Sequence, residues 1–312
     1  MPGIVGTIWN MPNFYGELYT ASPQNTPLLS MIGGLNGGKT TPNFEFPTSL
    51  NYALNAPGQN VVTEQAAFAA PAPTSIGRAQ VFNTCQIHQV SVRVSYTKMA
   101  NMGRLTGLAT TGVSVNPSDE LAWQIEQHLK QMANDIEFSF VQGVFAQAVN
   151  SGVAGQTRGM VATITGLGGT NINAGGAALN RTHLQNLFAG MFTAGAEFKD
   201  VILYTNAQYK QAISDIYGFA PADRTVGGLN IQQIETDFGR VGVIASRYAP
   251  DNQVLAIETS VLSPVYQEIP GKGLLFYEPL AKVGAGETGQ LYGHVGLDHG
   301  PAFMHGRIHT IA

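Results

Sequence analysis

The sequence is poor in charged side chains and nearly devoid of cysteine. Charged residues make up 12% of the 312 positions, about half of the usual share of ~25%. A chain with so little charge is expected to cover much of its surface with another molecule; a Gly- and Ala-rich β protein is the alternative interpretation. Cys85 is the single cysteine, which excludes an intrachain disulfide and a CxxC-type zinc site and fits folding in a reducing cytosol.

Clusters of positive charge and long apolar runs are also missing. The net charge is −4, and no run of lysine and arginine could grip a phosphate backbone, so a dedicated nucleic-acid-binding protein is not expected. The N-terminus lacks the basic start and apolar core of a signal peptide, and no stretch reaches the ~18 apolar residues of a membrane span. We therefore expect a soluble protein that is intracellular when made.

The first hundred residues predict two extended segments. Residues 1–40 hold four prolines and a Gly-rich end, which favours an extended arm over a packed domain. Residues 41–98 contain two β-type stretches, FEFP and HQVSVRVSY, and the second alternates apolar and polar residues at Val90, Val92 and Val94. The Ala- and Pro-rich stretch between them suggests a long two-stranded loop that projects from the body, with a disordered tip as the alternative.

A long helix is predicted over residues 119–149. Pro117 and Ser118 provide its start, Asp119 complements the helix dipole, and the turn signal that begins at Asn150 provides its end. Apolar residues at spacings of three and four form one stripe through Leu121, Ile125, Leu129, Met132, Ile136, Phe140 and Val144. About thirty residues at ~1.5 Å each give a rod of roughly 45 Å.

The second half of the chain predicts an α/β lobe followed by strands. Residues 180–250 contain a helix, a strand and a second helix in close succession, which indicates a compact lobe with a small sheet. From residue 251 to residue 312 β-type segments dominate, and the chain is expected to return to the first body. No repeat of fixed period is visible. The predicted fold class is therefore α+β.

One stretch spells a nucleotide-binding motif. GGLNGGKT, from Gly33 to Thr40, matches the phosphate-loop pattern GxxxxGK[ST]. That site needs a helix after the loop, whose free N–H groups hold the phosphates. Pro42 and Pro47 follow here and favour extended chain, so we interpret the segment as a flexible hinge between arm and loop. A nucleotide-binding enzyme stays an alternative, which ATP binding that is lost in Lys39→Ala would support.

Three further patterns look chemical but have structural interpretations. GAGETG, from Gly284 to Gly289, matches GxGxxG, yet it lies between two β-type segments and predicts a turn. Cys85 and His88 are three residues apart on a β-type stretch, so a nucleophilic pair is not expected. The third pattern is a group of possible metal ligands near the C-terminus: His294, Asp298, His299, His305 and His309. Their spacings do not fit a pair of metal ligands on one helix. We therefore predict no catalytic, cofactor-binding or metal-binding residue.

The segments follow one another in a recognisable order: TPLLSMIGG, FEFP, VSVRVSY, DELAWQIEQHLKQMANDIEFSFVQG, ALNRTHLQNLFAGMF, VILYTNAQYKQAIS and GRVGVIASRYAPDNQVLAIE. This order resembles that of the major capsid proteins of tailed bacteriophages with the Hong Kong 97-type fold. The segments look most like the subgroup of coat proteins that lack a cleaved N-terminal extension. The resemblance spans nearly the whole chain.

The resemblance implies a division into domains. Residues 1–40 are expected to form the N-terminal arm, and residues 41–98 the extended β-loop that overlaps a neighbouring subunit. Residues 99–179 are expected to form the peripheral domain, which includes the long spine helix. Residues 180–250 are expected to form the α/β axial domain near the capsomer centres, and residues 251–312 the return to the peripheral domain.

The resemblance also implies a structural function rather than an enzymatic one. The chain is expected to self-assemble into hexamers and pentamers of an icosahedral virion capsid around double-stranded DNA, without sequence-specific DNA contacts, in the host cytoplasm. Its other expected partners are a portal, decoration proteins and a separate scaffolding protein, because an arm that starts at Met1 leaves no room for an internal scaffold. Four charges of the loop are expected to pair across subunits: Glu45, Glu64, Arg78 and Arg93.

Two other assemblies remain as alternatives to a phage head. An encapsulin-like compartment is a shell of the same fold that encloses enzymes. A tail tube is a second alternative, against which the long helix argues, because tube proteins are chiefly β. Electron microscopy of native particles would separate DNA-filled heads, empty cages and tubes.

Overall fold

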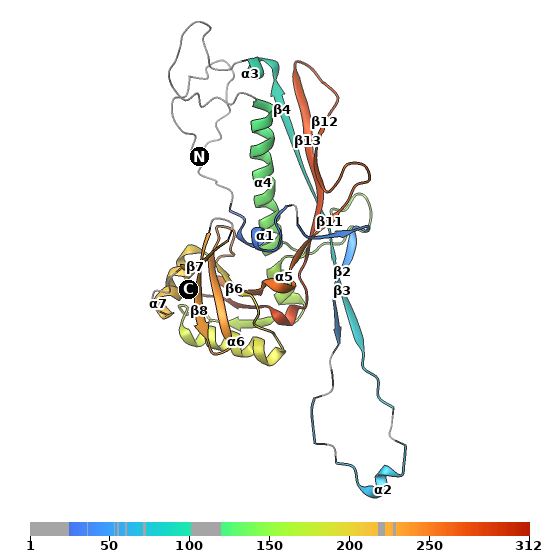
Figure 1. The fold of residues 1–312 in the computed structure, drawn as a ribbon, viewed down its shortest axis with the longest axis vertical. Coiled ribbons are helices and arrows are strands. Elements are labelled where there is room, and N and C mark those ends of the chain that lie inside the picture. The colour runs from blue at the N-terminus through green and yellow to red at the C-terminus, as the bar shows by residue number, and fades with distance from the viewer. Residues whose placement is uncertain are drawn as a thin grey trace.

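The protein is an elongated molecule with a lobe, a long helix beside a narrow sheet, and a hairpin that projects away from both (Figure 1). The computed structural model describes residues 25–35, 37–52, 54, 56–59, 61–70, 73–100, 120–217, 222–226 and 229–312. Most of the predicted arm and the predicted start of the long helix lie outside these residues. The mixture of helices and separate sheets confirms the α+β fold class.

The long helix α4 spans Glu120–Gln142 and contains 23 residues, which gives a length of about 35 Å. The predicted apolar stripe is confirmed in its second half, where Met132, Ile136 and Phe140 are completely buried. The predicted end at residue 149 is wrong. Val144, the last predicted member of the stripe, lies beyond the helix and is exposed.

The helix ends at Gln142, and at the next residue, Gly143, the chain passes too close to its neighbours for a side chain. A Cβ on Gly143 would lie 2.2 Å from the carbonyl oxygen of Ser139 and 2.7 Å from that of Thr157. The N–H of Gly159 donates to the Gly143 carbonyl at 2.9 Å, so the chain leaves the helix to pair with this later segment. The turn signal at Asn150, predicted to stop the helix, instead forms the turn between the two paired segments.

A five-stranded sheet packs along α4. Its strands are β1 (Lys39–Thr41), β4 (Gln86–Ser95), β11 (Ser263–Gln267), β12 (Leu275–Pro279) and β13 (Gly286–Asp298). The alternating pattern of β4 is confirmed, since Val92 and Val94 are buried while Arg93 is exposed. Its predicted location in the projecting loop is wrong, because the chain leaves the hairpin at Cys85 and β4 pairs with β13.

The lobe is built on a seven-stranded sheet. Its strands, in spatial order, are β5 (Thr170–Asn173), β14 (Gly306–His309), β10 (Gln253–Glu258), β6 (Val201–Thr205), β9 (Gly239–Ala245), β8 (Leu229–Thr236) and β7 (Ala222–Val226). Its helices are α5 (Met160–Gly166), α6 (Arg181–Ala194) and α7 (Ala207–Tyr217). The predicted helix–strand–helix succession is confirmed by α6, β6 and α7. The predicted return of residues 251–312 to the first body is only partly met, because β10 and β14 complete the lobe sheet.

The projecting hairpin consists of β2 (Glu45–Tyr52) and β3 (Arg78–Thr84), with the one-turn helix α2 (Glu64–Ala67) at its tip (Figure 1). The remaining short elements are α1 (Pro27–Met31), α3 (Tyr96–Ala100), η2 (Thr259–Val261) and η3 (Ala302–Met304). One hydrophobic core joins α1 and α4 to the five-stranded sheet and to one face of the lobe sheet, and a second lies within the lobe. None of the helices that the structure describes has the length and apolarity of a membrane span.

Candidate functional site: the projecting hairpin and its anchors

The hairpin exposes a concentration of large apolar side chains. Its loop and strands hold Leu50, Tyr52, Leu54, Val61, Val62, Phe68, Ile76 and Phe82 among the exposed hydrophobic residues. Near the tip, Val61 is 84% exposed and Phe68 is 85% exposed. Apolar exposure gathered in this way marks a surface that another molecule covers. An isolated two-stranded ribbon is also only marginally stable in water, so the same contact would stabilise the hairpin.

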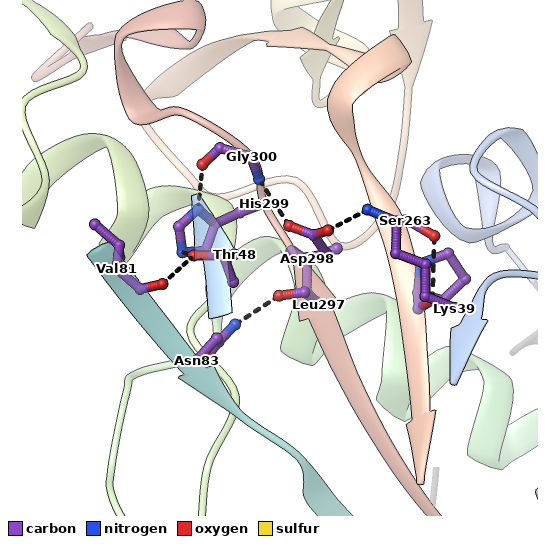
Figure 2. A network of polar contacts seen from close by, with 10 residues as sticks. Lys39, Thr48, Val81, Asn83, Ser263, Leu297, Asp298, His299 and Gly300 are labelled. Carbon is purple, nitrogen blue, oxygen red and sulfur yellow. Dashed lines mark hydrogen bonds and ion pairs between the residues drawn. The ribbon is translucent and has the colours of Figure 1, made fainter. Parts of the chain in front are cut away.

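Asn83 anchors the base of the hairpin to the body. Its side chain is completely buried, and Nδ2 donates to the carbonyl of Leu297 at 2.7 Å and to Oγ1 of Thr157 at 3.2 Å. Its Oδ1 accepts the N–H groups of Thr84 at 2.9 Å and Arg158 at 2.8 Å. One amide therefore joins β3 to the end of β13, as Figure 2 shows, and to the segment that pairs with the end of α4.

A second anchor lies on the other strand of the hairpin, at Thr48. The register between β2 and β3 shifts here, so Thr48 has no partner in the ladder. Its hydroxyl lies 3.2 Å from the carbonyl of Val81 and 3.3 Å from Nε2 of His299 (Figure 2). Nδ1 of His299 lies 2.7 Å from the carbonyl of Gly300 and must donate to it. Burial lowers the pKa of His299, which favours a neutral ring whose Nε2 is an acceptor. The carbonyl of Val81 and this nitrogen therefore share the single hydroxyl hydrogen of Thr48.

The phosphate-loop pattern from Gly33 to Thr40 leads into strand β1 rather than into a helix. Residues 39–41 are strand β1, which pairs in parallel with β11, so the predicted extended chain after the motif is confirmed. Lys39 Nζ forms an ion pair with Oδ2 of Asp298 at 2.6 Å. A Cβ on Gly38 would lie 2.4 Å from the carbonyl oxygen of Pro264. The interpretation as a flexible hinge is therefore wrong from Gly38 onward, because the sheet holds this part in place.

The C-terminal histidines take part in separate hydrogen bonds. His294 and His309 each contact an uncharged polar side chain at 2.8 Å. Nδ1 of His305 accepts the N–H of Glu258 at 3.2 Å, so its Nε2 donates to the carbonyl of His299 at 2.9 Å. Burial lowers the pKa of His305 to about 4. Within the described residues, no three His, Cys, Asp or Glu side chains are grouped to hold a metal ion.

The two remaining motifs have structural roles. Gly284 has φ 82° and lies in the bend before β13, but β13 begins at Gly286, so the predicted turn is confirmed only for the first two residues of the motif. A Cβ on Gly289 would lie 2.2 Å from the hydroxyl of Tyr277. Burial raises the pKa of the Cys85 thiol to about 12 and lowers that of His88 to about 4. Both shifts are opposite to those that a thiolate–imidazolium pair requires.

The four loop charges predicted to pair across subunits are all exposed: Glu45, Glu64, Arg78 and Arg93. Among the described residues, none of them forms an ion pair within the chain. The guanidinium of Arg93 donates to the carbonyl of Val283 at 3.3 Å. Their pairing with a neighbouring subunit stays a prediction.

A buried carboxylate that sequence reasoning missed joins three parts of the molecule. Glu137 of α4 is completely buried, and its carboxylate accepts the N–H groups of Leu28 at 2.9 Å and Leu29 at 2.7 Å and the hydroxyl of Tyr204 at 2.8 Å. Burial raises the pKa of Glu137 to about 7, against the opposing effect of these hydrogen bonds. The signal was its position four residues after Ala133, on the apolar face of the helix.

Comparison with known proteins assigns this chain to a family. A family model described as the SU10 major capsid protein matches residues 2–312. A search of curated protein sequences found no match.

The fold is similar to that of several solved shells. The capsid of Cyanophage A-1(L) is 14% identical, with 99% of each chain covered and a TM-score of 0.61. The holo-SrpI encapsulin complex from Synechococcus elongatus is 14% identical, with 97% of this chain and 92% of that chain covered and a TM-score of 0.61. The capsid of a native GTA particle is 10% identical, with 99% and 98% covered and a TM-score of 0.59. The predicted Hong Kong 97-type fold is thereby confirmed, and because the family model spans nearly the whole chain, the protein belongs to the SU10 major capsid protein family and is a structural protein of a phage capsid.

Proposed function

We propose that the β2–β3 hairpin lies across a neighbouring subunit when this capsid protein builds the icosahedral head of a tailed phage. The observation that carries the proposal is the uncovered apolar surface of the hairpin, together with the buried anchors that hold its base. Because its base is held rigidly, the two-stranded hairpin keeps a fixed direction from the body toward the neighbouring subunit. Hexamers and pentamers of the chain would enclose double-stranded DNA.

The predicted domains receive roles in this proposal. Residues 1–40 act as the arm, and the hairpin is the projecting part of the loop predicted at residues 41–98. Helix α4 and the five-stranded sheet belong to the peripheral domain of residues 99–179. Residues 180–250 form the axial domain near the capsomer centre. Residues 251–312 contribute strands to both, which the proximity of β10 and β14 to β6 supports.

The partners follow from the same assembly. A separate scaffolding protein, a portal and decoration proteins complete the head, which assembles in the host cytoplasm. The chain has a net charge of −4 and no basic run, so contact with the enclosed DNA is weak and independent of sequence. The proposed role is structural and not enzymatic. Mass spectrometry of purified particles would identify these partners.

An encapsulin-like compartment is the second candidate, favoured by the similarity to the encapsulin shell at a TM-score of 0.61. The two candidates differ in content, since a head encloses DNA and a compartment encloses protein cargo. Nuclease-treated native particles that retain encapsulated DNA support the head, whereas particles with a stoichiometric enzyme and no DNA support the compartment. A nucleotide-binding enzyme is disfavoured, because Lys39 is already paired with Asp298.

A double substitution at the hairpin tip tests the proposal. Val61→Ser with Phe68→Ser removes the two most exposed apolar side chains near the tip without touching the anchors. The variant is expected to fold, with an unchanged circular dichroism spectrum, and to remain as small oligomers in sedimentation. The matched control is Val283→Ser, a valine that is 73% exposed in the turn before β13, and it is expected to form shells. Normal shells from the double variant would contradict the proposal.

A further inference from the structure

The N-terminal strap, defined here as residues 25–35, packs between the lobe and the body that α4 and the five-stranded sheet form. Leu28 and Leu29 are buried in a core that also contains Ile136 of α4, Tyr204 of the lobe sheet and Val295 of the five-stranded sheet. The strap contains no strand of either sheet. It can therefore leave this position without breaking any strand pairing.

The first turn of α1 depends on Glu137 for its backbone hydrogen bonds. Pro27 has no N–H, and the N–H of Ser30 bonds to the Thr26 carbonyl at 3.0 Å. The two donors between them, on Leu28 and Leu29, both point to Glu137, and Thr26 makes no side-chain cap. A helix of five residues does not persist in isolation. Glu137 thus completes a turn that would otherwise leave two buried donors without partners.

Glu137 is surrounded by hydrogen-bond donors and forms no ion pair with any lysine or arginine that the structure describes. The carboxylate receives two backbone N–H groups from the strap and the hydroxyl of Tyr204 from β6. The other titratable groups near it are Tyr248 and Arg247, after β9, and Asp135, on its own helix. Burial also raises the pKa of Asp135. Burial raises the pKa of both tyrosines, so they stay neutral below about pH 10. Glu137 is therefore the group bonded to the strap whose charge can change near neutral pH.

We propose that Glu137 makes the attachment of the N-terminal strap sensitive to pH, holding the strap firmly when its carboxyl is neutral and loosely when it is ionised. The sign follows from the two surroundings of the side chain. In the docked strap, burial raises the pKa of Glu137 to about 7 from an ordinary value of 4.5. When the strap leaves, the carboxyl meets water and regains its ordinary pKa. Docking is therefore strongest below pH 4.5 and weakens as the pH rises to about 7.

The hydrogen bonds that do not titrate keep the strap near its site. The N–H of Asn25 donates to Oδ1 of Asn134 at 3.0 Å, and the hydroxyl of Tyr266 donates to the Gly34 carbonyl at 2.9 Å. Loosening is consequently centred on Leu28 and Leu29, between these two contacts. The pH-dependent contact therefore controls the part of the strap that packs against both the lobe sheet and α4.

Hydrogen exchange of assembled full-length shells tests the proposal directly, because the amides of Leu28 and Leu29 are themselves the donors to Glu137. Exchange into the peptide that contains them is measured by mass spectrometry at pH 5 and pH 8, with labelling times scaled to the intrinsic exchange rate. The protection of this peptide is expected to fall on the order of 50-fold between the two pH values. An equal protection at both would overturn the proposal.

Three variants identify the group responsible. Glu137→Gln cannot ionise and is expected to abolish the pH dependence, while Glu126→Gln, an exposed carboxyl on the same helix, is expected to keep it. Should Glu137→Gln fail to fold, Tyr204→Phe gives an independent test. It removes a donor that favours ionisation, so protection continues to fall above pH 7, where the wild type has levelled off. A pH dependence that survives in Glu137→Gln, or a Tyr204→Phe profile identical to wild type, would refute the role of Glu137.

Discussion

Replacing Asn83 by alanine is expected to detach the base of the hairpin. The substitution removes the acceptor of two backbone N–H groups, on Thr84 and Arg158, and the donor to the carbonyl of Leu297. Leu297 lies opposite Pro264 in the sheet, and a proline has no N–H to offer in exchange. Two buried backbone groups, on Thr84 and Leu297, and the partly buried N–H of Arg158 therefore lose a side-chain partner at once.

The expected loss of stability follows from the number of backbone groups that lose a partner. A buried polar group left without a partner costs about 1–3 kcal/mol, so the two buried groups give a loss of about 2 kcal/mol at the lower limit, to which the partly buried N–H of Arg158 adds. The free energy of unfolding of the unassembled chain, from urea denaturation followed by circular dichroism, measures the loss. Gln80→Ala, an exposed position on the same strand, is the control and is expected to change stability by less than about 0.5 kcal/mol.

The effect of Asn83→Ala on shell assembly should follow its effect on subunit stability. Asn83→Ala is expected to increase hydrogen exchange in the peptides of β2 and β3 and to lower the yield of shells, while the peptides of the lobe sheet stay protected. A variant that unfolds at the same urea concentration as Gln80→Ala would refute the reasoning. So would a loss of stability spread evenly over the lobe.

Three further outcomes are expected. Burial lowers the pKa of His305 to about 4, so as the pH falls the unfolded chain binds a proton at this histidine before the folded chain does. The free energy of unfolding therefore falls between pH 6.5 and pH 4. The difference between the free energies of unfolding at pH 7 and at pH 5 should be about 2 kcal/mol smaller in His305→Gln than in the wild type. Gly143→Ala, which would stabilise an ordinary helix interior, should instead cost about 2 kcal/mol in urea denaturation, because its Cβ meets the carbonyl oxygen of Thr157 at 2.7 Å. Charge reversal of Arg78 should lower the yield of shells seen by electron microscopy without altering subunit stability, and reversal of Glu45 should act alike if these charges pair across subunits.

Local patterns in the sequence predicted the elements better than their ends or partners. The stripe through Ile136 and Phe140 identified α4, and alternation at Val92 and Val94 identified β4. The end of α4 was missed because it depends on contact between Gly143 and a segment fourteen or more residues later, which periodicity does not contain. The partner of β4 was missed for the same reason, since β13 lies almost two hundred residues further along the chain.

The anchors were harder to predict than the exposed surface. The sequence indicated a projecting loop, and its scarce charges drew attention to Glu45 and Arg78. Nothing local distinguishes Asn83 from an ordinary polar residue of a strand, because its importance comes from backbone groups of Arg158 and Leu297. Glu137 did leave a signal, a carboxyl on an apolar helix face, but its partners in the strap are more than a hundred residues away.

Cryo-electron microscopy of the assembled full-length chain tests the central claim most directly. The account predicts a closed icosahedral shell in which the β2–β3 hairpin of each subunit lies on its neighbour and the side chains of Val61 and Phe68 are buried there. Asn83 and Thr48 should hold the base of the hairpin as they do in the single chain. A shell in which the hairpin points into solvent, or particles that are tubes rather than shells, would contradict it.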